Sequence, residues 1–126
     1  MQVGIVPRDL AVSLAFYRDV LGFSYVGGRP VIEGRTLHFF EADGGILKLL
    51  EQPADAPPVT ARAPGGGFAR ATGLRWITFD VDDLDAVVAR CGDRTFQMPV
   101  TELRAGLRVC IVEDPDGNAV ELVERR

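Results

Sequence analysis

The sequence repeats itself, and this repeat constrains the possible folds more than any other feature. Asp9-Leu10 recurs 74 residues later as Asp83-Leu84, and Asp43-Gly44 recurs 73 residues later as Asp116-Gly117. Apolar and acidic positions match at the same offsets: Val3 with Ile77, Ile5 with Phe79, Leu47 with Val120, Leu49 with Leu122, and Glu51 with Glu124. A repeat of this kind predicts two copies of one structural unit, neither of which is stable by itself.

Each copy predicts the element order β-α-β-β-β, and therefore an α+β fold. Alternating strands begin both copies, and Asp9 and Asp83 then precede apolar residues at helical spacing, with Gly22 and Gly92 as helix ends. In the first copy we expect strands at 2–6, 23–26, 35–41 and 46–51, with a turn-rich interval at 27–34. In the second copy we expect strands at 76–81, 95–100, 107–113 and 119–124.

The chain has the length of one domain, residues 1–126, built from two repeats. We expect a first βαβββ module at 1–52, a connecting loop at 53–73 and a second module at 74–126. The loop holds four prolines and three consecutive glycines, Gly65 to Gly67, which favours a flexible linker or a flap beside a pocket. A phosphate-binding loop is disfavoured because no Gly-Lys-Ser/Thr follows.

Residues 112–124 predict a β-hairpin. Pro115 sets φ for the turn, Asp116 can bond its own backbone, and Gly117 takes positive φ without strain. The returning strand carries Glu121 among apolar residues, and a buried carboxylate is costly unless it is paired. Glu121 is therefore solvated, paired or functional.

The alternation of the strands assigns residues to two faces. The face toward the helices takes Val3, Ile5, Leu47 and Leu49 in one copy and Ile77, Phe79, Val120 and Leu122 in the other. Polar residues collect on the opposite face, among them Gln2, Lys48, Trp76, Thr78, Asp80 and Glu121. Polar groups spaced among apolar ones are what a ligand pocket requires.

Charge and cysteine content limit the possible partners and the cellular location of the protein. The formal net charge of −4 disfavours nucleic acid as a partner. Cys91 and Cys110 lie in helical and strand patterns without CxxC spacing, which is typical of reduced, buried thiols. No apolar run approaches the ~20 residues of a membrane span. We therefore expect a cytoplasmic protein that binds neither nucleic acid nor a membrane.

Two motifs at their proper separation resemble a known family. They are Asp9-Leu10 with the run from Ser13 to Phe23, and the run from Glu113 to Asn118 with Glu121-Leu122. This pattern resembles the vicinal oxygen chelate superfamily, which includes glyoxalase I, bleomycin-resistance proteins and extradiol dioxygenases. The resemblance implies two βαβββ modules forming an incomplete mixed barrel around a pocket, usually in a homodimer.

The resemblance also implies where a metal would bind. Family metal positions map to Gln2, Lys48, Trp76 and Glu121. A protonated lysine and an indole N–H have no lone pair to offer, which leaves at most two oxygen ligands, and catalytic zinc usually has three protein ligands. We therefore predict a pocket that uses no metal cofactor.

These positions suggest binding roles, each with a structural alternative. Lys48 neutralises Glu121 beside a ligand, or the two form only an ion pair. Trp76 stacks on a planar or cationic ligand, or it is a core or dimer-interface residue. Thr78 and Asp80 share this strand face, where Asp80 would add negative potential.

Three further residues have predicted roles that are mostly structural. The facing of His38 is not fixed by the sequence, and its repeat partner at an offset of 73, Ile111, favours a structural histidine over a base. Arg35 and Arg108 match at the same offset, and surface ion pairs are favoured over binding of an anion.

Three functions follow from the sequence. The first is a metal-independent small-molecule binder that sequesters an aromatic or cationic compound. The second is a metal-dependent lyase, isomerase or dioxygenase of the glyoxalase type, against which Lys48 counts. The third is a metal-free enzyme in which Glu121 acts as general base and Lys48 polarises a carbonyl.

Overall fold

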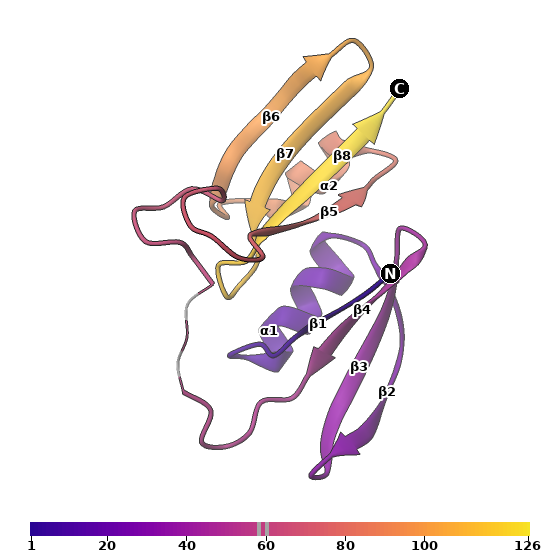
Figure 1. Ribbon diagram of the computed structural model, residues 1–126. Helices are drawn as coiled ribbons and strands as arrows, with labels where there is room; N and C mark the ends of the chain where they lie inside the picture. The colour runs from indigo at the N-terminus through magenta and orange to yellow at the C-terminus, as the bar shows by residue number, and fades with distance from the viewer. Residues whose placement is uncertain (58, 60) are drawn as a thin grey trace. The chain divides into compact units, whose positions relative to one another are not determined.

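The computed structural model describes residues 1–57, 59 and 61–126, so positions 58 and 60 of the predicted connecting loop lie outside the described residues. The chain divides into two compact units, Met1–Val59 and Thr60–Arg126, called unit 1 and unit 2 below (Figure 1). Each unit is described by itself. The module bounds at 1–52, 53–73 and 74–126 stay a prediction.

Unit 1 has the predicted βαβββ order. One mixed four-stranded sheet has the strand order β1-β4-β3-β2, with β1 parallel to β4 and the other neighbours antiparallel. The elements are β1 (Gln2–Ile5), α1 (Leu10–Ala15), η1 (Phe16–Val20), β2 (Ser24–Ile32), β3 (Arg35–Ala42) and β4 (Gly45–Leu50).

Unit 2 repeats this plan, which confirms the α+β fold of two βαβββ modules. Its sheet has the order β5-β8-β7-β6, with β5 parallel to β8 and the other neighbours antiparallel. The elements are β5 (Trp76–Asp80), α2 (Leu84–Cys91), β6 (Phe96–Arg104), β7 (Leu107–Glu113) and β8 (Ala119–Arg125).

The first helix begins as predicted but ends in a π-helical turn. Asp9 caps α1, and its carboxylate accepts a hydrogen bond from Val12 N at 3.2 Å. The following turn, η1, is π-helical, and Leu21 N donates to Phe16 O at 3.0 Å. The wider turn inserts one residue, so the adjacent Phe16 and Tyr17 are both fully buried. Regular 3.6-residue spacing predicts only Tyr17 on the apolar face.

Strand β2 is longer than predicted. The sequence predicts a strand at 23–26 followed by turns, because Gly27, Gly28 and Pro30 are turn residues. The strand in fact continues to Ile32, with register shifts between Tyr25 and Gly27 and between Pro30 and Ile32. Strand β2 lies at the edge of the sheet, and an edge strand tolerates proline and bulges because one side of its backbone forms no hydrogen bonds to a neighbouring strand.

The repeat has a third offset that the sequence does not reveal. His38 pairs with Leu49, and Cys110 pairs with Leu122, so 72 relates β3 to β7. The predicted partners at an offset of 73 are therefore wrong: His38 corresponds to Cys110 and not to Ile111, and Arg108 corresponds to Thr36 and not to Arg35. The reason is one extra residue between equivalent paired positions: two residues separate Ala42 from its partner Gly45, and three separate Asp114 from Asn118, to which it is hydrogen-bonded.

The hairpin predicted at 112–124 joins β7 to β8. The Asp114 carboxylate accepts hydrogen bonds from Asp116 N at 2.9 Å, Asn118 N at 2.8 Å and Asn118 Nδ2 at 2.8 Å. Asp114, to which the sequence analysis gave no role in the turn, thus accepts hydrogen bonds that organise it, and the role predicted for Asp116 stays a prediction. Gly117 has φ 85°, as the predicted turn requires.

Both units bury most of the predicted apolar face, whereas Val3, Ile5 and Ile77 on β1 and β5 are only half-buried. Leu47 and Leu49 are buried in unit 1, and Val120 and Leu122 are buried in unit 2. Cys110 lies in the same core of unit 2, where burial raises the pKa of its thiol to about 12, with smaller contributions from Cys91 and Glu121. Both cysteines are free and buried, in agreement with their predicted packing role.

No helix among the described residues is long and apolar enough to cross a membrane.

Candidate functional site

Strands β5 and β8 place the predicted polar residues of unit 2 on one sheet face. Their parallel register pairs Trp76 with Ala119, Thr78 with Glu121 and Asp80 with Val123. Residues paired across neighbouring strands point to the same side of a sheet. The opposite side carries Val120 and Leu122 of the core, so the Trp76–Glu121 face is the one that α2 does not cover.

Glu121 is half-buried and has one direct partner on this face. The Thr78 hydroxyl donates a hydrogen bond to Glu121 Oε2 at 2.5 Å. On the other side, Glu121 neighbours the buried Ile111 of β7. Among the described residues, Glu121 Oε1 has no hydrogen-bond partner. One carboxylate oxygen is therefore held in place, and the other remains able to accept a donor from a ligand.

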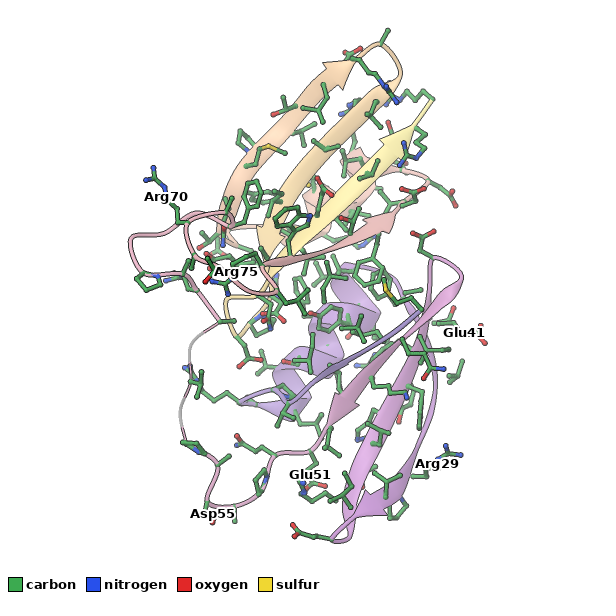
Figure 2. All side chains as sticks on the ribbon, viewed as in Figure 1. Arg29, Glu41, Glu51, Asp55, Arg70 and Arg75 are labelled. Carbon is green, nitrogen blue, oxygen red and sulfur yellow. The ribbon has the colours of Figure 1, made fainter. Side chains whose placement is uncertain are left out.

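Trp76 is an exposed residue on the same sheet face as Glu121 and pairs with Ala119 across the β5–β8 ladder. Its side chain is 44% exposed, and the Phe68 ring meets it edge-on, with ring centroids 5.2 Å apart. Phe68 belongs to the predicted connecting loop, which thus contacts the sheet of unit 2. The side chain of Arg70, in the connecting loop, projects outward (Figure 2). The side chain of Arg75, just after the loop, donates a hydrogen bond to Ala61 O at 3.2 Å.

Asp80 is paired with a cation at the end of this face. Arg125 Nε lies 3.2 Å from Asp80 Oδ2, and both side chains are about half exposed. The ion pair offsets the negative potential that the sequence predicts for Asp80. An exposed pair of this kind contributes little stability.

Glu113 is a buried carboxylate on the same sheet face, and the sequence analysis assigned it no site role. It pairs with Ala119 in the β7–β8 register. Arg62 forms an ion pair with it and donates from Nε to Oε1 at 3.1 Å, and Gln97 Nε2 donates to Oε1 at 3.0 Å. The strand alternation could have placed Glu113 on the sheet face of Glu121. No periodic pattern in the sequence predicts that Arg62 pairs with it.

A small cavity lies between the connecting loop and this sheet. Its volume is about 10 Å³, enough for a single water molecule. Phe68, Gln97 and Ala119 line it, and Gln97 Oε1 is buried there without a hydrogen-bond partner among the described residues. The cavity is too small for an organic ligand.

Gln2 and Lys48 belong to the sheet of unit 1. Lys48 is half-buried and pairs with Gly4 of β1 and Phe39 of β3, while Gln2 is exposed. A Cβ atom added at Gly4 would meet nothing within 4 Å, so the space beside Lys48 is open. The ion pair between Lys48 and Glu121 joins residues of different units and stays a prediction.

His38 lies on the helix-facing side of unit 1 and not on the Lys48 face. It pairs with the fully buried Leu49, and its Nδ1 is 2.8 Å from the Tyr25 hydroxyl. This placement supports the structural interpretation of His38. No sequence pattern fixed it, because the length of the β3–β4 turn sets the register.

The four predicted metal positions do not fit a metal ion. Lys48 and Trp76 offer only N–H donors, and the one carboxylate, Glu121, already accepts the Thr78 hydroxyl. Among the described residues, no group of three or more His, Cys, Asp and Glu side chains could hold a metal ion. We therefore derive no chemistry through a metal at these positions.

Comparison with known proteins shows the family. Residues 2–122 match the model of the Glyoxalase/Bleomycin resistance protein/Dioxygenase superfamily. The match covers nearly the whole chain and agrees with the two mixed sheets described above. The chain belongs to this superfamily.

Individual relatives support this assignment. The chain is 32% identical over 132 residues to the uncharacterized protein YaeR of Escherichia coli K12, covering 98% of this chain and 93% of that one. A glyoxalase family protein of Bacillus cereus has a TM-score of 0.78 at 20% identity, covering 98% of this chain and 91% of that one. TnmS3, an antibiotic binding protein from Streptomyces, has a TM-score of 0.64 at 22% identity, covering 99% and 93%.

Proposed function

We propose that this protein binds a small aromatic or cationic compound on the Trp76–Glu121 face and sequesters it without using a metal. One observation carries the proposal. Glu121 is held by Thr78 through one oxygen, keeps the other oxygen free of described partners, and lies on the same sheet face as the exposed Trp76, which pairs with Ala119 two residues before it on β8. A carboxylate beside an indole face is a suitable receptor for an aromatic cation.

The chemistry of the two side chains defines the ligand. The face of a tryptophan ring attracts a cation within about 6 Å of the ring centroid, and stacking adds to this attraction. Glu121 supplies a full negative charge in a half-buried setting, where it is less screened than at an open surface. A planar cation can interact favourably with both groups. An anion would be repelled by Glu121, because no described residue forms an ion pair with that carboxylate.

Other parts of the predicted site extend this proposal. Thr78 orients the carboxylate, Asp80 at the end of β5 would contact a ligand through its ion pair with Arg125, and Lys48 and Gln2 are the ligand-contacting residues that unit 1 would supply. We also retain homodimerisation and a cytoplasmic location as predictions. Binding by TnmS3, described as an antibiotic binding protein, supports a binding role through fold likeness alone.

A metal-free enzyme is a second candidate, and one observation favours it. Glu121 has an oxygen without a described partner, and such an oxygen could accept a proton from a bound substrate. In that case Glu121→Gln would abolish turnover while Trp76 still reported binding. The metal-dependent lyase, isomerase or dioxygenase remains the alternative that a metal analysis would detect.

A ligand screen on metal-stripped protein tests the proposal. Thermal unfolding is followed with a panel of aromatic cations, neutral aromatics and aromatic carboxylates, with and without added nickel, zinc or iron. We expect the aromatic cations to raise the unfolding midpoint without added metal, and Glu121→Gln to remove the effect. Stabilisation that requires a metal, or turnover of a small substrate, would contradict sequestration.

A further inference from the structure

A second candidate site lies in unit 1, apart from the Trp76–Glu121 face. It is a cleft of about 730 Å³ at the start of α1, between the β2–β3 turn and the segment that follows β4. The walls are tied together, because Glu51 N donates to Thr36 O at 3.0 Å and Gln52 Nε2 donates to Arg8 O at 2.8 Å. The lining residues are Leu10, Glu33, Gly34, Arg35, Glu51, Gln52, Pro53, Ala54 and Asp55.

The corresponding place in unit 2 is filled by the protein's own cations. Glu124 is the repeat partner of Glu51, and its side chain is 5% exposed. Arg108 Nη1 lies 3.2 Å from Glu124 Oε1, and Arg126 Nε lies 2.6 Å from the same oxygen. The other oxygen, Oε2, accepts Leu84 N at 2.8 Å. Two guanidinium groups thus neutralise the carboxylate at this point of the repeat.

Unit 1 lacks both of these cations. Adding 72 relates Thr36 to Arg108, and adding 73 relates Pro53 to Arg126, so two short uncharged residues replace two arginines. Glu51 Oε2 accepts Thr36 N at 3.0 Å, and no described residue forms an ion pair with Glu51. The carboxylate is retained, and the open cleft beside it is lined by Pro53, the repeat partner of Arg126.

The charges along the cleft also favour a cation. Glu33, Glu51 and Asp55 give three negative charges, and Arg35 gives one positive charge, so the lining has a formal charge of −2. Arg35 Nη1 donates to the Glu51 main-chain oxygen at 3.0 Å, and its buried Nε has no hydrogen-bond partner among the described residues. Glu51 and Asp55 both lie on the segment that leaves β4 (Figure 2). This balance would repel an anion and attract a cation.

We propose that this cleft binds a small organic cation whose guanidinium or ammonium group takes the place that Arg126 holds in unit 2. Glu51 is the counter-ion, and the carboxylates at the rim favour a ligand with a second positive charge. The site is independent of the Trp76–Glu121 face, and neither proposal depends on the other.

Two matched probes test this site by calorimetry and by backbone NMR at about 0.15 M salt. Agmatine carries a guanidinium and an ammonium group, and N-carbamoylputrescine replaces the guanidinium with a neutral urea. We expect saturable agmatine binding with shifts centred on Thr36 and Glu51, and affinity for N-carbamoylputrescine at least about tenfold weaker. Absence of saturable agmatine binding, or shifts centred on Trp76, would overturn the proposal.

Three variants separate the cleft from general attraction to an acidic protein. Glu51→Gln should weaken agmatine at least about tenfold, whereas Glu41→Gln, an exposed site on β3 outside the cleft, should not change it (Figure 2). Thr36→Arg should place a guanidinium beside Glu51, abolish agmatine binding and raise the unfolding midpoint. Equal weakening by Glu51→Gln and Glu41→Gln, or unchanged binding to Thr36→Arg, would contradict the proposal.

Discussion

The Thr78 hydroxyl donates to Glu121 Oε2 at 2.5 Å across the parallel pair β5 and β8. The hydrogen bond fixes one side of a half-buried carboxylate that the sequence places, unusually, in an apolar strand. It therefore sets the direction of the Glu121 carboxylate on the sheet face that it shares with Trp76.

Removing the Thr78 hydroxyl should weaken both folding and binding. Thr78→Val keeps the shape but removes the donor, so we expect the free energy of unfolding to fall by about 0.5–1.5 kcal/mol. Affinity for an aromatic cation should fall as well, because Glu121 loses its orientation. Urea unfolding and ligand titration measure the two effects, and Thr78→Ser, which keeps the donor, is the control. Equal behaviour of the two variants would contradict this role.

Breaking the Arg62–Glu113 ion pair should destabilise unit 2. Arg62→Met leaves the buried Glu113 with one fewer donor, and an uncompensated buried charge is costly. We expect the midpoint of thermal unfolding to fall by several degrees. Arg70→Met is the matched control, because it makes the same change on the same segment at an exposed position. A midpoint that shifts equally in both variants would show that the ion pair is not responsible.

Stability should decrease in acid through the Glu124 network. The hydrogen bond from Leu84 N and the nearby Arg126 and Arg108 lower the pKa of Glu124, and Arg108 lowers the pKa of Asp85. A lowered pKa in the folded state means that the unfolded state binds protons first. The contribution is therefore complete above the usual glutamate pKa of about 4.3 and is lost as pH falls through the folded pKa.

Urea unfolding between about pH 3 and pH 7 measures this effect in variants of the network. Glu124→Gln should be less stable than wild type near neutral pH and should lose less stability toward acid. Glu41→Gln, at an exposed position of β3 in unit 1, should follow the wild-type curve. If Glu124→Gln kept the wild-type slope below about pH 4, the lowered pKa would not be the source of the acid sensitivity.

The N-cap of α2 gives a local test of the fold. The Asp83 carboxylate accepts Ala86 N at 2.9 Å, so Asp83→Ala should lower the free energy of unfolding by about 1 kcal/mol. Asp82→Ala removes the adjacent exposed carboxylate and should have little effect. Chemical unfolding of both variants makes the comparison, and a larger loss for Asp82→Ala would contradict the cap assignment.

The sequence predicted the architecture well because alternation and helix caps are local signals. Asp9 and Asp83 cap the helices as expected, and the apolar faces of β4 and β8 are buried. The π-helical turn at Phe16 and the extension of β2 through Pro30 were missed. Both depend on how a segment packs in its own unit, which no periodic pattern records.

The candidate site was predictable only in part. Alternation placed Trp76, Thr78 and Glu121 on one face, as the register shows. The ion pair between Arg62 and Glu113 joins residues that are far apart in the sequence, and pattern analysis cannot pair them. The cleft beside Glu51 was not predicted. A single constant offset matched Arg35 with Arg108, whereas the extra residue in the β7–β8 turn makes Thr36 the true partner of Arg108.

The most direct test is titration of metal-stripped protein with a planar aromatic cation such as 1-methylquinolinium, read by tryptophan fluorescence. Trp76 is the only tryptophan, so its emission reports this face alone. We predict saturable quenching without added metal, and affinity at least about tenfold weaker in Glu121→Gln. Quenching that appears only with added nickel, zinc or iron, or an affinity unchanged by Glu121→Gln, would contradict the account.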